Sequence, residues 1–235
     1  MTAFALTSAR PQRGMGMEGF VARWYASLTR KSLDDFKTLA RQVAEQLPHG
    51  TAARDAAVLE VAPGPGYFAI ELAKLGDYQI TGLDISQTFV EIAQRNAEQA
   101  HVAVDFQRGN ASDMLFKSDR FDFILCRAAF KNFAAPLGAL REMHRVLKPG
   151  GRALIIDLRK DSSNESVSRQ VDGMKLGPVN TALTKATFRF MLLKRAYTRR
   201  DFEEMAAQTL FDKVEIRDSL TQLEIVLSKS PQCLE

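Results

Sequence analysis

One glycine-rich bend constrains this 235-residue chain more than any other stretch. Residues 58–62 form an apolar run interrupted by Glu60, residues 63–66 read Pro-Gly-Pro-Gly, and an apolar-periodic helix is predicted at 67–75. A buried strand that enters a helix through a tight turn presents backbone amides to a nucleotide-like ligand. Gly64 and Gly66 lack a Cβ that would hinder the ligand, and either can adopt positive φ. The bend therefore predicts an α/β protein with a nucleoside ligand.

Strand-like and helix-like segments alternate along most of the chain. Strands are predicted at 57–62, 79–84, 102–107, 121–126, 152–158, 214–217 and 223–227, and helices at 67–75, 86–99, 137–147 and 199–208, with Ser86 and Thr198 as caps. The run 121–126 is almost unbroken apolar sequence, as is typical of a central parallel strand. A short turn joins the last two strands, which predicts an antiparallel hairpin. We expect a doubly wound, Rossmann-like fold with a seven-stranded, mostly parallel sheet and helices on both faces.

The length is sufficient for one domain with a full core, and the composition is ordinary for a globular protein. We expect a single domain over 1–235, with a helical cap at 1–50, a ligand-binding core at 55–160 and a final helix and hairpin at 198–229. Within the cap, one helix is predicted over 17–47, with Ser32 as a cap before Asp34 and Asp35. The less periodic segment 161–197 holds an apolar-basic run at 188–194, which is either core or a lid over a substrate.

Composition also limits compartment and partners. Cys126 lies in an apolar strand and Cys233 in a polar tail, so no disulfide is expected and a reducing cytoplasm fits. No apolar run approaches the ~18 residues of a membrane span, and 1–10 does not resemble a signal peptide. We therefore expect a cytoplasmic protein without a membrane partner.

The net charge is +4, and one basic cluster contains Lys194, Arg195, Arg199 and Arg200. No aromatic residues alternate with these cations as in nucleic-acid-binding surfaces, which favours a solvated face over a nucleic-acid partner. The three histidines, at 49, 101 and 144, have no metal-ligand spacing, and no metal is expected.

Polar residues follow four successive strands, where open α/β sheets bind ligands. The bend follows the first strand, and Asp84 ends the second, 18 residues after Gly66. A carboxylate there can accept hydrogen bonds from both hydroxyls of a ribose. Asn110 follows the third strand in a polar bend suited to a base edge. Arg127 follows the fourth and would face the ligand from the other side.

Four motifs resemble those of the class I S-adenosylmethionine-dependent methyltransferases, in particular the small-molecule group that includes the ubiquinone and menaquinone C-methyltransferases. They are the bend at 60–66, Gly-Leu-Asp-Ile-Ser at 82–86, Phe-Asp-Phe-Ile at 121–124, and Leu-Arg-Glu-Met-His-Arg-Val-Leu-Lys-Pro-Gly-Gly at 140–151. The last run is the most specific, because nicotinamide dehydrogenases have no reason to carry it. The resemblance covers about residues 55–160 and implies S-adenosylmethionine as the cofactor.

The resemblance also implies roles for individual residues. Glu60 would support the bend, whose backbone would contact the methionine part of the cofactor. The ribose would bind Asp84, with Ile85 on the adenine face. The implied cofactor contacts of the core are Glu60, Ala62, Pro63, Gly64, Gly66, Asp84, Ile85, Asn110 and Ala111.

Two further residues are implied near the methyl group. Arg127 would border the cofactor and the acceptor, and it is the candidate catalytic residue. A structural ion pair between Arg127 and an acid such as Asp157 is the alternative. Tyr25 in the N-terminal helix would contact the cofactor carboxylate. An aromatic face near the sulfonium could come from Trp24, Tyr25, Tyr67 or Phe130.

The chain departs from the family pattern at three places. Ala62 replaces the usual first glycine of the bend, a small change that should fit. Asn110 stands where an aspartate is common and brings no charge. The segment Phe-Lys-Asn-Phe at 130–133 replaces a frequent histidine-containing segment, so no histidine base is expected there.

The expected function is methyl transfer by in-line displacement to a small apolar or aromatic molecule. Three alternatives stay open. Residues 64–69 satisfy the G-x-G-x-x-A pattern of a nicotinamide-dependent oxidoreductase. A nucleic-acid methyltransferase would want an Asn/Asp-Pro-Pro-Tyr/Phe segment after the fourth strand, which this chain lacks. A non-methylating or regulatory S-adenosylmethionine-binding protein is the third. An exposed apolar helix or lid could also support a homodimer.

Overall fold

In the computed structural model, described here for residues 17–47, 56–173, 177–188 and 192–231, seven strands form one sheet in the order β3-β2-β1-β4-β5-β7-β6. The strands are β1 (Ala57–Val61), β2 (Gln79–Asp84), β3 (Asp105–Arg108), β4 (Phe121–Arg127), β5 (Leu147–Leu158), β6 (Lys213–Asp218) and β7 (Gln222–Ser228). β1 to β5 pair in parallel, and β7 runs antiparallel between β5 and β6. The predicted seven-stranded sheet with its antiparallel hairpin is confirmed.

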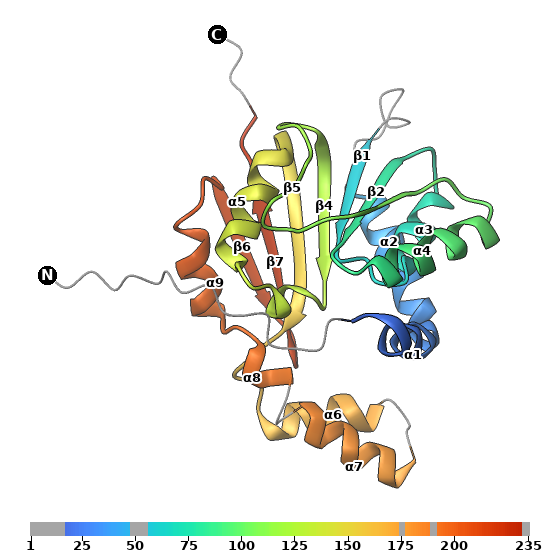
Figure 1. The fold of residues 1–235 in the computed structure, drawn as a ribbon. Helices are drawn as coiled ribbons and strands as arrows, with labels where there is room; N and C mark the ends of the chain where they lie inside the picture. Colours follow the sequence, from blue (N-terminus) through green and yellow to red (C-terminus); the bar gives the residue numbers. More distant parts are fainter. Residues whose placement is uncertain (1–16, 48–55, 174–176, 189–191, 232–235) are drawn as a thin grey trace, which may run out of the picture.

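Helices cover both faces of this sheet, as predicted (Figure 1). One core packs the sheet against α2 (Leu33–Ala44), α3 (Tyr67–Ala73) and α4 (Gln87–Gln99). The other core packs it against α5 (Pro136–Val146) and α9 (Arg199–Ala206). Consecutive strand residues point to opposite faces, so along β4 Leu125 enters the first core and Cys126 the second.

The strand register brings the ends of the parallel strands to one level. Val61, the last residue of β1, is paired with Leu83 of β2 and with Cys126 of β4. The glycine bend, Asp84 and Arg127 therefore follow side by side on three neighbouring strands. We call this side of the sheet the carboxyl edge.

The single helix predicted over 17–47 is wrong, because the segment forms two helices. α1 (Gly19–Thr29) ends in a 3₁₀ turn, η1 (Arg30–Ser32), before α2 begins. The Thr29 hydroxyl donates back to the carbonyls of Tyr25 and Ala26, and Ser32 leaves helical geometry at φ −97° and ψ 24°. Ser32 precedes α2, yet its side chain makes no capping hydrogen bond.

Two strand boundaries also differ from the prediction. β5 begins at Leu147, directly after α5, whereas a strand was expected from residue 152. Gly150 adopts φ +82° and pairs with Lys229, so the Pro-Gly-Gly stretch continues the strand through an irregular register. β3 occupies Asp105–Arg108 and not 102–107. The predicted caps are confirmed, because Ser86 accepts from Phe89 N–H and Thr198 from Asp201 N–H.

The segment between β5 and α9 forms a small helical layer below the carboxyl edge in Figure 1. It contains α6 (Asn164–Gly173), α7 (Pro178–Thr187) and α8 (Leu193–Arg195). Val167, Val171 and Leu193 form a core of their own, against which Phe188 packs. Residues 189–191 of the apolar-basic run lie outside the described residues. Phe188 and Leu193 of that run thus belong to the core of this layer, whereas Lys194 is exposed, and the role of the run as a lid stays a prediction.

Candidate functional site

The bend after β1 is a tight turn that faces unfilled space. Gly66 N–H donates to Pro63 O at 3.1 Å, and both Gly64 and Gly66 have positive φ, at +55° and +78°. Gly64 is buried, yet a Cβ built on it would meet no atom of the described residues within 4 Å. A Cβ on Gly66 would instead lie 2.6 Å from the Phe106 ring. Gly64 thus leaves room for a ligand, whereas Gly66 permits helix and strand to pack.

Backbone strain collects at the same edge. Ala62 adopts φ +56° and donates to Leu83 O at 2.8 Å, and Ala128, just after β4, adopts φ +57°. A left-handed conformation costs a residue with a Cβ about 1–2 kcal/mol. Ala62 therefore fits where the resemblance expects glycine, but at this energetic cost. Strained residues of this kind are often found at functional sites.

Asp84 ties the bend to the end of β2. Its Oδ2 accepts from Gly64 N–H at 3.0 Å, and its Oδ1 accepts from Ser86 N–H at 2.9 Å. The carboxyl group is buried, which raises its pKa, while the two backbone hydrogen bonds oppose that rise. Each oxygen keeps a second lone pair, so a ligand hydroxyl can still donate to it.

Glu60 lies in β1, next to its last residue, and it is buried in the sheet. Its Oε2 accepts from Ala69 N–H in α3 at 3.1 Å. Burial raises the pKa of Glu60 to about 8, although that hydrogen bond and the nearby Arg127 charge both lower it. At neutral pH this side chain is mainly uncharged.

The predicted adenine contacts lie next to Asp84. Ile85 is half exposed at the carboxyl edge, and the Gly109 N–H donates to Asp84 O at 2.8 Å, which holds the third bend beside β2. Asn110 is exposed, and its Oδ1 accepts from Ser112 N–H at 3.0 Å. Ala111 packs on the core below. The structure thus brings Asp84, Ile85 and Asn110 together.

Arg127 does not form the structural ion pair considered from the sequence. Its guanidinium lies over the Phe36 ring, 4.4 Å from the centroid. Asp157 instead binds Lys131, with 2.9 Å between Nζ and Oδ1. The register explains this, because Arg127 is paired with Ile156, so the next residue, Asp157, points to the opposite face.

The segment 130–133 is a buried support. Phe130 and Lys131 belong to a 3₁₀ turn, η3 (Phe130–Asn132), and Asp157 also accepts from the Lys131 backbone N–H at 2.8 Å. The side chains of Lys131 and Asp157 are only 6% and 1% exposed. Phe130 is fully buried against Phe202, so it cannot offer an aromatic face to a ligand, and that suggestion is wrong.

Tyr25 is half-buried on α1 and packs edge-on against Phe89. Burial raises the pKa of its hydroxyl, and Arg127 lies close enough to oppose the rise. Tyr67 holds α1 in place, because its hydroxyl donates to Ala26 O at 3.1 Å. Tyr25 thus lies within electrostatic reach of Arg127, and its contact with the cofactor carboxylate stays a prediction, whereas Trp24 is 57% exposed.

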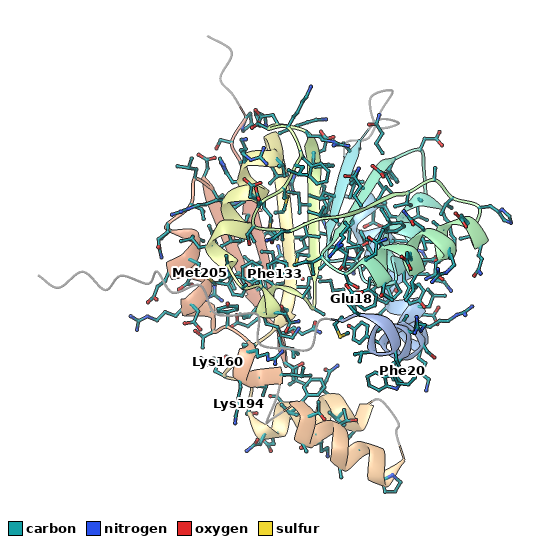
Figure 2. All side chains as sticks on the ribbon, viewed as in Figure 1. Glu18, Phe20, Phe133, Lys160, Lys194 and Met205 are labelled. Carbon is teal, nitrogen blue, oxygen red and sulfur yellow. The ribbon has the colours of Figure 1, made fainter. Side chains whose placement is uncertain are left out.

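Sequence reasoning missed two residues that shape the site. Glu18, labelled in Figure 2, accepts from the backbone N–H groups of Gln87 and Thr88 at 3.1 Å each and so holds α1 on the start of α4. Phe36 carries the stacked Arg127. The only sequence signal for Glu18 was an acid before a helix, and Phe36 looked like one more apolar position of α2.

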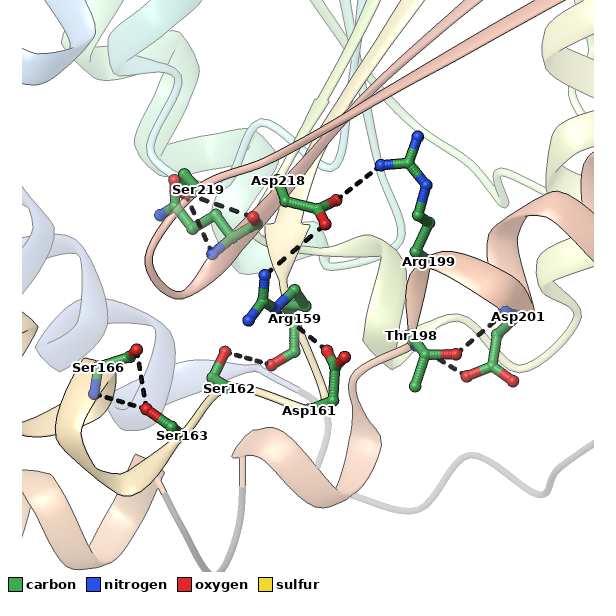
Figure 3. A network of polar contacts seen from close by, with 11 residues as sticks. Arg159, Asp161, Ser162, Ser163, Ser166, Thr198, Arg199, Asp201, Asp218 and Ser219 are labelled. Atoms are coloured by element: carbon green, nitrogen blue, oxygen red, sulfur yellow. Dashed lines mark hydrogen bonds and ion pairs between the residues drawn. The ribbon is translucent and has the colours of Figure 1, made fainter.

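A network of polar contacts lies where the chain enters and leaves the helical layer, and we call this place the neck of the layer (Figure 3). Lys160 N–H donates to Tyr197 O at 3.0 Å, which joins the two ends of the 161–196 excursion. Arg159 lies 3.1 Å from Asp161 and 3.8 Å from Asp218, and Asp218 also binds Arg199. The Arg159 Nε is close to Asp161 but is not aligned for a hydrogen bond. The layer therefore leaves and re-enters the sheet at one point.

The predicted basic cluster is partly neutralised. Arg199 pairs with Glu203 and Asp218, and Arg200 pairs with Glu204. This favours the solvated-face interpretation. Within the described residues, no group of three His, Cys, Asp or Glu side chains is placed to hold a metal. No described helix has both the length and the apolar content needed to cross a bilayer.

The strand order 3-2-1-4-5-7-6, with a glycine bend after β1 and an acid ending β2, is that of the Rossmann-like methyltransferase fold. A family model described as a methyltransferase domain matches residues 59–155. The matched residues hold the bend, Asp84 and Arg127 and make up less than half of the chain, and in this part the chain is similar to methyltransferase domains.

Curated relatives match less than half of this chain. A demethylmenaquinone methyltransferase of Deinococcus radiodurans is 35% identical over 107 residues, which cover 45% of this chain and 44% of the relative. A 2-phytyl-1,4-naphtoquinone methyltransferase of Synechococcus elongatus is 36% identical over 110 residues, 45% and 47% of the two chains. The chain thus spans just under half the length of these relatives.

The fold matches a solved structure over almost its full length. A proposed S-adenosyl-L-methionine-dependent methyltransferase of Methanococcus maripaludis superposes with a TM-score of 0.71 and 19% identity, over 95% of this chain and 98% of that one. At this identity the likeness supports the fold alone.

Proposed function

We propose that this chain transfers a methyl group from S-adenosylmethionine to a small-molecule acceptor. The observation that carries the proposal is the bend from Ala62 to Gly66, which Asp84 holds against β2 and which faces unfilled space at Gly64. The curated relatives, which are named as methyltransferases of demethylmenaquinone and of 2-phytyl-1,4-naphtoquinone, support a small-molecule acceptor.

The residues present fit the cofactor. The backbone of Ala62, Pro63, Gly64 and Gly66 would border its methionine part, and Glu60 would support that stretch from β1. The free lone pairs of Asp84 would accept from the ribose hydroxyls. Ile85 would cover the adenine, whose edge would meet Asn110 and Ala111. Tyr25 would approach the methionine end, and Arg127 would border the methyl group and the acceptor.

S-adenosylmethionine supplies an activated methyl group, which passes to the acceptor by in-line displacement. The protein's part is to align the acceptor and to exclude water. Lys131 is not placed to act on an acceptor, because its side chain is buried and its Nζ is bound to Asp157. Arg127 and Tyr25 are the polar side chains that we assign to the acceptor side.

The segment 161–197 would act as the lid over the acceptor. Its separate core and single neck support this assignment, because such a layer can move without disturbing the sheet. Its position below the carboxyl edge would place it over the mouth of the site (Figure 1).

Calorimetric titration with S-adenosylmethionine, S-adenosylhomocysteine and NADH tests the proposal. We expect micromolar binding of both adenosyl ligands and none of NADH. Asp84→Ala should weaken adenosyl binding by about 1–3 kcal/mol, because ribose hydrogen bonds are lost. The control Asp105→Ala removes an exposed acid at the start of β3 and should change nothing. Binding of NADH alone would overturn the proposal.

One alternative has a specific observation in its favour. The segment 130–133 offers no base, so the chain could bind the cofactor without methylating any acceptor. This alternative predicts S-adenosylhomocysteine binding together with no methyl transfer across a broad acceptor screen. Turnover of one acceptor would exclude it.

A homodimer through α1 is a further proposal. Phe20, Trp24 and Leu28 recur at intervals of four and are 77%, 57% and 46% exposed on the described surface of α1. Sedimentation of the wild type and Trp24→Glu tests it, since a monomeric wild type excludes the dimer.

A further inference from the structure

We propose that Arg127, stacked on Phe36, is an oxyanion subsite for the acceptor, and that the acceptor is therefore a planar aromatic molecule with a carboxylate or another acidic oxygen. The inference rests on the proposed function and names its substrate class.

Arg127 has donors without partners. Its side chain makes no hydrogen bond or ion pair with any described residue, and its guanidinium lies over the Phe36 ring. Among the described residues, every buried side-chain nitrogen or oxygen except Arg159 Nε has a hydrogen-bond partner. The unpartnered nitrogens of Arg127 are therefore not buried, and they are open to solvent. Stacking on a ring fixes the plane of a guanidinium and leaves its edge free for bidentate contact with an oxyanion.

The charge of Arg127 has no carboxylate partner among the described residues. Glu60, an electrostatic neighbour of Arg127, hydrogen-bonds to Ala69, and burial raises its pKa to about 8, which favours its uncharged form at neutral pH. Asp157 points to the other face and is already paired with Lys131. An uncompensated cation in a half-buried position favours an anionic ligand.

The surroundings of Arg127 are aromatic. The Phe36 ring lies 5.8 Å from the Tyr67 ring, and Tyr25 approaches from α1. Flat apolar walls favour a flat apolar ligand, and the Tyr25 hydroxyl could donate to the same oxyanion. The combination of rings with one cation selects an aromatic acid over an aliphatic or cationic molecule.

The position of Arg127 assigns this subsite to the acceptor rather than to the cofactor. The bend and Asp84 place the cofactor over β1 and β2, whereas Arg127 ends β4 on the other side of Val61. The carboxylate of the cofactor is the other possible source of an oxyanion. The experiment below separates the two sources.

The test uses the full chain saturated with S-adenosylhomocysteine. The probes are benzoate, 4-hydroxybenzoate and 2-naphthoate, each compared with its neutral amide by competition binding. We expect at least one carboxylate to bind at least tenfold more tightly than its amide. Arg127→Met should abolish this preference. Arg120→Met is the matched control, because Arg120 precedes the same strand at its opposite end and also stacks on rings, those of Phe116 and Phe121.

The source of the oxyanion is tested with the same variants. S-adenosylhomocysteine and 5′-methylthioadenosine, which lacks the amino-acid part, are titrated against the wild type and Arg127→Met. We expect less than a threefold change for either ligand. Weakened S-adenosylhomocysteine binding with unchanged 5′-methylthioadenosine binding would move Arg127 to the cofactor and overturn the inference. So would a panel in which every carboxylate binds no better than its amide. Either result leaves the proposed function standing as long as the wild type binds S-adenosylhomocysteine.

Discussion

At the scale of single residues, the two glycines of the bend have different tasks. Gly66 has φ +78° and no room for a Cβ next to Phe106 and Ala93, whereas Gly64 has φ +55° and open space. The same residue type is thus required once for packing and once for ligand access. Substitution by alanine should separate these two requirements.

We expect Gly66→Ala to lower the free energy of unfolding by about 2–4 kcal/mol, since backbone strain adds to overpacking. Gly64→Ala should cost only about 1–2 kcal/mol of stability, from the backbone alone. It should nevertheless weaken S-adenosylhomocysteine binding at least tenfold, because its methyl group enters the ligand space. Urea unfolding and calorimetry measure both effects. Equal stability losses in the two variants would contradict the assignment.

Glu60 makes stability depend on pH. Burial raises its pKa to about 8, above the unfolded value of 4.5, so the folded state holds the proton more tightly. The contribution is full below about pH 4.5 and is lost as the pH rises to about 8. Relative to Glu60→Gln, the wild type should therefore lose stability between pH 5 and pH 8, by at most about 1.4 kcal/mol per pH unit.

The control for this measurement is Glu142→Gln. Hydrogen bonding to Arg145 lowers the pKa of Glu142, so that group stays ionised between pH 5 and pH 8. Its substitution should shift stability by a constant amount across the window. A wild-type profile parallel to that of Glu60→Gln would show that Glu60 is not protonated in the folded protein.

At the scale of elements, the buried Lys131–Asp157 pair joins η3 to β5. Lys131→Met should cost about 3–5 kcal/mol, because it leaves a buried carboxylate without a counter-ion. The matched control is Lys148→Met, whose pair with Asp122 is 39% and 23% exposed and should contribute under about 1 kcal/mol. Thermal unfolding of both variants measures the difference. Recovery in the double variant Lys131→Met/Asp157→Asn would confirm the cause.

The strands could be predicted from the sequence, whereas some contacts between elements could not. Apolar runs and glycine turns predicted seven strands and placed Asp84, Asn110 and Arg127 at one edge, because parallel strands end together. Local patterns could not predict which cation Asp157 binds, since that depends on the register of β4 against β5. The break at Thr29 was missed for a related reason. A threonine can bond to its own helix or point to solvent, and only the packed structure decides.

At the scale of the whole molecule, the helical layer is an insertion with adjoining ends. Lys160 and Tyr197 are hydrogen-bonded, so a short Gly-Ser linker can replace residues 161–196. We expect the shortened protein to fold and to bind S-adenosylhomocysteine within threefold of the wild type. Acceptor turnover should be lost if the layer is the lid. Circular dichroism and calorimetry check the first two expectations. A tenfold loss of S-adenosylhomocysteine affinity would assign the layer to the cofactor site instead.

The place of β7 between β5 and β6 also has a consequence for synthesis. The ribosome makes β6 before β7, yet β6 reaches the sheet only through β7. Until residues 222–228 emerge, the apolar edge of β5 has no hydrogen-bonding partner and β6 has no place in the sheet. A nascent chain therefore carries an open strand edge from the completion of β5 until β7 emerges, and edges of this kind invite pairing with other chains. Chaperone demand should accordingly be highest just before β7 is completed.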